Sequence, residues 1–125
     1  MLRDIASSAI VAVGDLPRAR AFYADVLELP IVEESGEVIV FATGSTRLVV
    51  YRSDAAGGNR ANAVVWGCGD EIHAIVAALE RKGVTFEHYP AMEGLTLEGN
   101  VHVAGGATLV WLKDPDGNIL HLNSF

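Results

Sequence analysis

The sequence has one cysteine, few basic residues and no long apolar run. A single Cys68 among 125 residues excludes an intramolecular disulfide framework and a cysteine-based zinc site. Lysine and arginine number 9 against 16 aspartates and glutamates, giving a net charge of −7 and no basic cluster for nucleic acid. The apolar run at residues 9–13 is too short to span a membrane or direct export. We therefore expect a cytoplasmic protein with neither a membrane nor a nucleic-acid partner.

The remaining composition is that of a globular protein. Half of the residues are hydrophobic and a fifth are charged. A chain of this length forms one domain that buries about 65% of its unfolded surface. The only linker-like stretch is residues 55–59, Ala-Ala-Gly-Gly-Asn. It separates two modules, residues 1–55 and 60–125, within a single domain over residues 1–125.

The first module reads as strand, helix and three strands. Residues 8–13 are strand-like, and Asp15 can cap a helix that has Pro17 in its first turn and runs to about Glu28. The apolar residues of that helix recur at helical spacing: Ala19, Phe22, Tyr23, Val26 and Leu27. Three short strands follow at residues 31–34, 38–43 and 47–52, separated by glycine turns.

The second module repeats this order with one long insertion. Residues 63–66 read as a strand, Asp70 as the cap of a second helix, and Gly83 as its end. Residues 85–89 form another strand, and an irregular stretch runs from Pro90 to about Gly106. Long loops in compact domains are commonly functional, and this one is too apolar to be simply solvated. We interpret it as a flap that covers a pocket.

The chain closes with a hairpin over residues 111–122. Asp116-Gly117 suits a two-residue turn, because its central positions need positive φ. Alternation then puts Ile119, His121 and Asn123 on one face of the last strand, opposite the apolar Leu120 and Leu122. The face that carries His121 can line a cavity.

Two motifs in this chain resemble those of the vicinal oxygen chelate superfamily, which includes glyoxalase I, extradiol dioxygenases and the fosfomycin- and bleomycin-resistance proteins. One is Val-Gly-Asp-Leu-Pro-Arg-Ala-Arg-Ala-Phe-Tyr at residues 13–23, and the other is Lys-Asp-Pro-Asp-Gly-Asn-Ile-Leu at residues 113–120. The resemblance covers the whole chain. It implies an α+β fold of two βαβββ modules whose curved mixed sheets surround a central cleft, with helices on the outer faces.

The resemblance also implies where a metal would be bound. The family's enzymes hold a divalent metal with His, Gln and Glu from four strands. The matching positions here are Ser8, then Val49 or Tyr51, then Ala63 or Val64, and finally His121. Only the last carries a good ligand, whereas a stable site needs about three. We therefore predict no metal and no other cofactor, and the alternative is a rebuilt site of His88, His102 and His121.

The preferred function is that of a metal-free small-molecule-binding protein of the bleomycin-resistance type, which the resemblance suggests to be a homodimer. Its unidentified ligand is apolar or aromatic and lies in the cleft between the sheets. Aromatic side chains supply large contact area at little entropic cost. The predicted ligand-binding residues are Tyr51, Trp66, Tyr89, Met92, His102, Trp111 and His121.

Three alternatives remain open. The chain could be a lyase, isomerase or dioxygenase that uses a rebuilt histidine metal site. It could be a metal-free enzyme with His121 as its catalytic acid–base, because an imidazole titrates near neutral pH. His102 would assist, and Glu33, Glu98 or Tyr89 would orient the base. It could also be a structural or regulatory module whose cleft is filled by side chains.

Overall fold

The computed structural model describes residues 1–125, which form two compact units. The first comprises residues 1–63 and 114–118, and the second comprises residues 64–113 and 119–125. The closing turn at residues 114–118 thus belongs with the first unit, although in sequence it lies inside the second module. No helix in either unit is long and apolar enough to cross a membrane.

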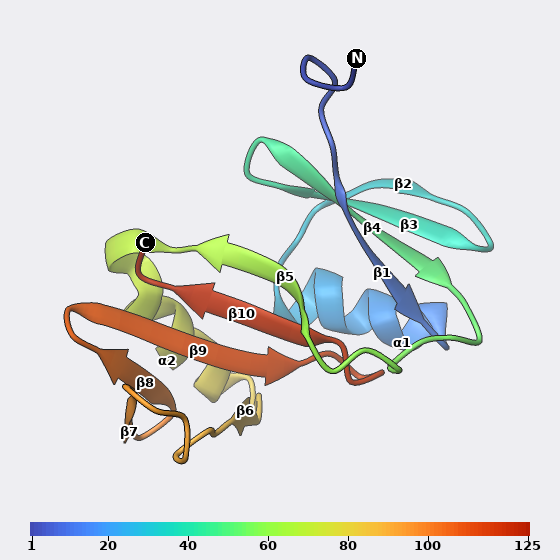
Figure 1. The fold of residues 1–125 in the computed structure, drawn as a ribbon. Helices are drawn as coiled ribbons and strands as arrows, with labels where there is room; N and C mark the ends of the chain where they lie inside the picture. The colour runs from blue at the N-terminus through green and yellow to red at the C-terminus, as the bar shows by residue number, and fades with distance from the viewer. The chain divides into compact units, whose positions relative to one another are not determined.

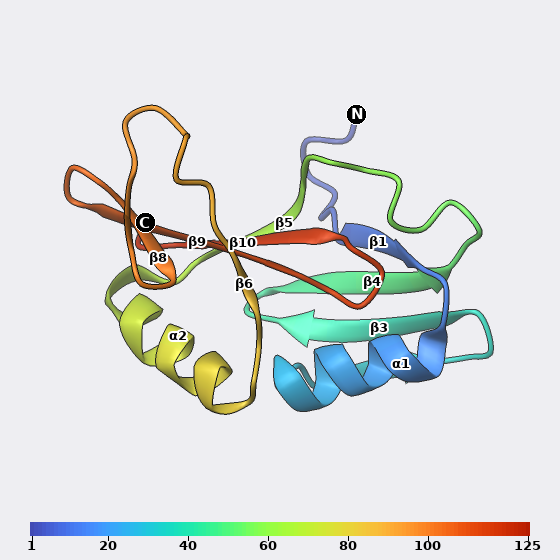
Figure 2. The same cartoon turned by 90° about the horizontal axis from the view of Figure 1, so that it is seen from below.

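The first unit is a four-stranded sheet with a helix along one face (Figures 1 and 2). The strand order is β1-β4-β3-β2, with β1 parallel to β4 and the other pairs antiparallel. Buried side chains on the helix side include Val11, Phe41 and Val50, and α1 contacts β3 and β4. The elements in chain order are β1 (Ala9–Val13), α1 (Leu16–Arg20), the π-helix η1 (Ala21–Val26), β2 (Ile31–Glu34), β3 (Val38–Thr43) and β4 (Thr46–Arg52).

The first helix begins as predicted and changes type partway along. The Asp15 carboxylate accepts a hydrogen bond from the Arg18 N–H at 2.9 Å, and Pro17 occupies the first turn. After Arg20 the chain continues as six residues of π-helix in place of the α-helix expected to about Glu28. The π-helix ends at Val26, and Glu28, two residues later, has φ of 60°, a conformation that non-glycine residues rarely adopt. The buried residue of the π-helix is Tyr23.

The second unit is a six-stranded sheet with α2 along one face (Figure 2). The strand order is β5-β10-β9-β8-β7, and β6 also pairs with β9. The helix side carries the buried Val110, Leu112, Leu120 and Leu122. The elements in chain order are β5 (Asn62–Gly67), the 3-10 helix η2 (Gly69–Glu71), α2 (Ile72–Arg81), β6 (Phe86–Glu87), β7 (Thr96–Glu98), β8 (Val101–Ala104), β9 (Ala107–Lys113) and β10 (Ile119–Asn123).

The start of α2 differs from the prediction. Asp70 lies inside the short 3-10 helix, and the residue before α2 is Glu71, which makes no side-chain capping bond. A capping residue normally has extended backbone, but Glu71 already has helical φ and ψ of −80° and −6°. The end of the helix is as predicted, because Gly83 has φ of +79° and donates its N–H to the Glu80 carbonyl.

The stretch predicted as an irregular flap contains two strands. Residues 96–98 and 101–104 form β7 and β8, which extend the sheet beyond β9. Leu97 pairs with His102, and His102 pairs with Leu109, so this hairpin buries its inward side chains as a strand pair does. Residues 88–95, between β6 and β7, and the turns at residues 99–100 and 105–106 lie outside regular structure. The prediction of an irregular stretch over residues 90–106 is therefore wrong for residues 96–104, which form a strand hairpin, and right for residues 90–95.

The closing turn is longer than predicted. Five residues separate Lys113 from Ile119, in place of a two-residue turn. The Gly117 N–H donates to the Asp114 carbonyl at 3.0 Å, which puts Pro115 at the second position of a four-residue turn. Proline is fixed near φ −65°, so it fits that position, and the turn has Pro115 and Asp116 at its centre in place of Asp116 and Gly117.

Candidate functional site

The face of the first sheet that carries no helix is largely apolar. Strand register places Ile10 beside Val49, and Val49 beside Val40. Two residues further along β4, Tyr51 lies between its strand partners Ala12 and Val38. Ile10 is 61% exposed, and the four residues Val38, Val40, Val49 and Tyr51 are half-buried. The predicted binding residue Tyr51 therefore lies on the helix-free face.

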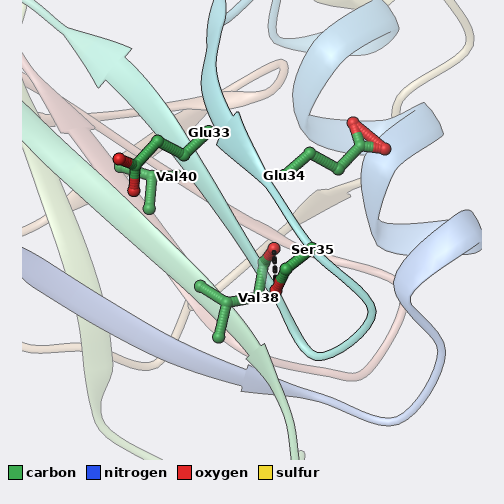
Figure 3. Close-up of a pocket in the computed structure, with 5 residues that line it drawn as sticks. All are labelled: Glu33, Glu34, Ser35, Val38 and Val40. Atoms are coloured by element: carbon green, nitrogen blue, oxygen red, sulfur yellow. Dashed lines mark hydrogen bonds between the residues drawn. The ribbon is translucent and has the colours of Figure 1, made fainter.

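A hollow of about 440 Å³ opens beside this face at the β2–β3 hairpin (Figure 3). Val38 and Val40 are its apolar members, and its polar members are Glu33, Glu34 and Ser35. Ser35 is turned inward, since its hydroxyl donates to the Val38 carbonyl at 3.4 Å. The volume is within the range of small-molecule pockets, which is about 300–1,000 Å³. Nothing in the sequence pattern distinguishes this hollow, because it depends on how the hairpin bends.

The helix-free face of the second sheet carries an array of contacting rings. Trp111 stacks on His121 with centroids 4.7 Å apart, and its other side meets His102 edge-on at 4.9 Å. Tyr89 joins from the segment after β6, at 5.3 Å from Trp111 and 5.8 Å from His102. Four of the seven predicted ligand-binding residues thus meet in one cluster. Except for Tyr89 they are buried, so the array is closely packed.

His121 is held by hydrogen bonds at both ring nitrogens. Its Nδ1 lies 3.0 Å from the Val110 carbonyl, so Nδ1 carries the proton and donates. Its Nε2 lies 3.4 Å from the Asn123 side-chain amide, which donates to it. This arrangement corresponds to a neutral imidazole. To act as a catalytic base, His121 would have to exchange the long Asn123 contact for a substrate.

His102 is fully buried and holds the segment after β6. Its Nε2 accepts the Tyr89 backbone N–H at 2.8 Å, so in the neutral ring the proton is on Nδ1. Nδ1 is buried without a hydrogen-bond partner of good geometry. Burial lowers the pKa of His102, and the backbone of Leu109 on the neighbouring strand opposes this only in part. His102 therefore stays neutral and acts as an acceptor for the backbone.

The predicted binding residues Met92 and Trp66 lie outside the ring array. Met92 is 44% exposed in the turn between β6 and β7. On β5, Trp66 alternates with Gly67, whose added Cβ would meet the Phe125 carbonyl and lie 3.8 Å from Asn123 Oδ1. Gly67 thus points toward the side of Asn123, and Trp66 points to the opposite face of the sheet from the ring array.

The residues present do not form a metal site of the family's type. Ser8 precedes β1, and the second and third positions offer only Val49 or Tyr51 and Ala63 or Val64. The nitrogens of His121 are already engaged. No group of three His, Cys, Asp or Glu side chains is arranged to hold a metal ion.

The rebuilt histidine site is not assembled either. His88 is exposed, and its Nε2 donates to Asn100 Oδ1 at 2.8 Å, while the Asn100 amide donates to Glu80 at 2.9 Å. His88 thus joins the segment after β6 to the β7–β8 turn, and Asn100 joins that turn to α2. The thiol of Cys68 makes a long contact of 3.6 Å to the Trp66 carbonyl, and burial raises its pKa.

Comparison with known proteins agrees with this fold. The structure resembles lactoylglutathione lyase from Agrobacterium tumefaciens, with a TM-score of 0.72 and 20% identity over 98% of this chain and 95% of that one. It resembles the fosfomycin resistance protein FosX from Listeria monocytogenes, with a TM-score of 0.70 and 15% identity over 96% and 90%. It also resembles a glyoxalase family protein from Enterococcus faecalis, with a TM-score of 0.72 and 18% identity over 98% of this chain and 99% of that one.

At these identities the structural matches establish the fold alone. None of the curated protein sequences compared with this chain is significantly similar to it. The model of one sequence family, however, matches residues 5–122, nearly the whole chain. This chain therefore belongs to the glyoxalase/bleomycin resistance protein/dioxygenase superfamily.

Proposed function

We propose that this protein binds an apolar or aromatic small molecule without a resident metal, in the manner of the bleomycin-resistance proteins. The observation that carries the proposal is the helix-free face of the first sheet. Its half-buried Val40, Val49 and Tyr51 lie beside a hollow of small-molecule size. When a ligand covers apolar surface of this kind, binding is favoured by about 25 cal/mol for each Å² of apolar area removed from water.

The donor set supports the metal-free part of the proposal. Of the four positions that hold metal in the family's enzymes, only His121 has an imidazole, and its nitrogens bond to Val110 and Asn123. We expect protein purified without chelator, then offered zinc, nickel, manganese or iron, to retain less than about a tenth of an equivalent, since a metal site needs about three ligands. Near-stoichiometric metal that is lost in His121→Ala would overturn this part.

The ligand-binding part is tested with a neutral fluorescent probe. We expect the emission of N-phenyl-1-naphthylamine to rise on binding, and Tyr51→Ala to weaken its binding by about tenfold, the equivalent of one aromatic contact. Phe125→Ala is the matched control, because it removes a ring that is 77% exposed on the second unit. Equal affinity in wild type and Tyr51→Ala, or no rise in emission at all, would refute the proposal.

We also propose that the protein is a cytoplasmic homodimer. Large apolar side chains are exposed on both units, including Ile10, Val32, Val65 and Phe125, and a second copy is one way to cover them. Its one cysteine is a free thiol, which suits a reducing compartment. Sedimentation equilibrium at micromolar concentration tests the assembly, and a single monomeric species would refute it.

A further inference from the structure

The β2–β3 hairpin contains an irregularity that determines where its carboxylates point. Ile31 pairs with Phe41, but the register then shifts, so that Glu33 pairs with Val40 and Glu34 with Ile39. In a regular strand, Glu33 would lie on the same face as Ile31, the helix side. The bulge moves it to the helix-free face. Figure 3 shows the two glutamates pointing to opposite sides of β2.

The three glutamates of this hairpin differ in their ion pairs. Both carboxylate oxygens of Glu34 lie 3.0 Å from Arg20 Nε. Glu37 pairs with Arg52 at 3.1 Å. Glu33 forms no ion pair and no hydrogen bond.

A cation on the helix-free face, Arg47, makes no ion pair with Glu33. Arg47 lies on that face opposite Ala42, and its guanidinium donates to the backbone carbonyl of Thr46 at 3.1 Å. Glu33 is thus the one carboxylate of the hairpin left without a counter-ion, and it is the one that the bulge turns toward the hollow.

The surroundings of Glu33 are apolar on one side and open on the other. Its carboxylate lies beside Val40, and Val38 is the second apolar residue of the hollow (Figure 3). A carboxylate next to an apolar wall is complementary to a cation that carries an apolar body. A simple metal ion would find only one oriented carboxylate there, because Glu34 is already bound to Arg20. The net charge of −7 also favours the approach of cations.

We propose that this hollow binds the ammonium group of an amphipathic primary amine, with Glu33 as its counter-ion and Val38 and Val40 against its alkyl chain. This inference rests on the proposed function and names the chemical class of the ligand. Glu33 confers the preference for a cation, while the valines contribute the apolar contact. The site is on the first unit alone.

The test uses n-hexylammonium as the probe and the ¹⁵N-labelled full chain. We expect binding at about millimolar affinity, as for other small fragments, with the largest amide shifts at Val38 and Val40. n-Hexanol, which has the same chain without the charge, should bind about fivefold more weakly, because an ion pair with the exposed Glu33 contributes little more. Hexanoate should not bind.

Matched variants separate the local role of Glu33 from general electrostatics. Glu33→Gln should weaken n-hexylammonium binding about fivefold and leave n-hexanol binding unchanged. Glu37→Gln removes the same charge from the same hairpin, at a carboxylate paired with Arg52, and should leave both unchanged. Equal losses in the two variants, unchanged binding in Glu33→Gln, or amide shifts that map away from β3 would overturn the inference.

The outcome is distinguishable from failure of the proposed function. If N-phenyl-1-naphthylamine binds through Tyr51 while n-hexylammonium does not bind at Glu33, the amine inference is wrong and the proposed function stands. If n-hexylammonium binds and the neutral aromatic probe does not, the aromatic ligand class is wrong and the amine site stands.

Discussion

The buried carboxylate of Asp114 ties the closing turn to the first unit, and Tyr23→Phe tests how much this contributes to stability. Asp114 is only 4% exposed. One of its oxygens accepts the Tyr23 hydroxyl at 2.7 Å and the Asn118 side-chain amide at 2.7 Å. The other accepts the backbone N–H groups of Asp116 and Asn118, each at 2.9 Å. The substitution removes one of these four donors and changes nothing else in the carboxylate's surroundings.

The expected loss follows from the charge and burial of the acceptor. Phenylalanine keeps the ring contacts of Tyr23 with Phe22, at 5.1 Å, and with Phe41, at 5.8 Å. The cost is therefore that of a hydrogen bond to a buried charged group, about 2 kcal/mol. At an unfolding entropy of about 2.1 cal/mol/K per residue, this lowers Tm by about 8 °C for a chain of this length.

Urea denaturation followed by tryptophan fluorescence measures this change in the free energy of unfolding. Tyr51→Phe is the control, because its hydroxyl has no hydrogen-bond partner in the structure and its loss should cost less than about 0.5 kcal/mol. A Tyr23→Phe loss no larger than that of the control would refute the reasoning. It would mean that water replaces the phenol as a donor to Asp114 at no cost.

The raised pKa of Tyr23 leads to a prediction of how stability changes at alkaline pH. Burial raises the pKa of Tyr23, and the Asp114 carboxylate that accepts its hydrogen bond raises it further. Above pH 10 the unfolded chain loses this proton while the folded protein keeps it, so the contribution of Tyr23 to stability falls as pH rises beyond 10. Wild type should therefore lose stability between pH 9.5 and 11 more steeply than Tyr23→Phe.

Two further predictions concern His102 and Gly57. Because burial lowers the pKa of His102, the unfolded chain takes up this proton near pH 6.5 before the folded protein does, and stability falls as pH drops. His102→Gln keeps an acceptor for the Tyr89 N–H but cannot titrate, so urea midpoints from pH 7 to 5 should decline less steeply than in wild type. Gly57 has φ of +77°, and an added Cβ would overlap the Asp116 carbonyl, so Gly57→Ala should cost about 2 kcal/mol or more. Gly58→Ala, whose nearest contact is 3.6 Å, should cost less than 1 kcal/mol, and equal losses in the two would contradict the contact.

Features that depend on neighbouring residues could be predicted from the sequence. The Asp15 cap with Pro17 in the first turn was predicted correctly, because capping involves one side chain and an N–H three residues away. The stop at Gly83 is equally local. The two faces of β10 follow from alternation, which puts His121 and Asn123 together, and the two motifs identified the family that the model over residues 5–122 confirms.

Features that depend on distant residues could not be predicted. Residues 101–104 become strand because β9 offers them an edge to pair with, and residues 96–98 pair with them in turn. No pattern within the segment indicates that edge. The bulge at Glu33 could not be foreseen, because either face of β2 can accept a glutamate at an exposed hairpin. The ring array likewise depends on register, which brings Trp111 beside His121 from across the closing turn.

The sequence by itself determined the family, the α+β class, the order of most helices and strands, and the scarcity of metal ligands, because these depend on residue type and short-range spacing. Only the tertiary structure decided what each polar group does. Tyr23 and Asp114 are 91 residues apart in sequence and share a hydrogen bond at 2.7 Å. The environment of a polar group depends on its contacts across the fold, so tertiary structure distinguished His121, whose two ring nitrogens are hydrogen-bonded, from Glu33, which has no counter-ion.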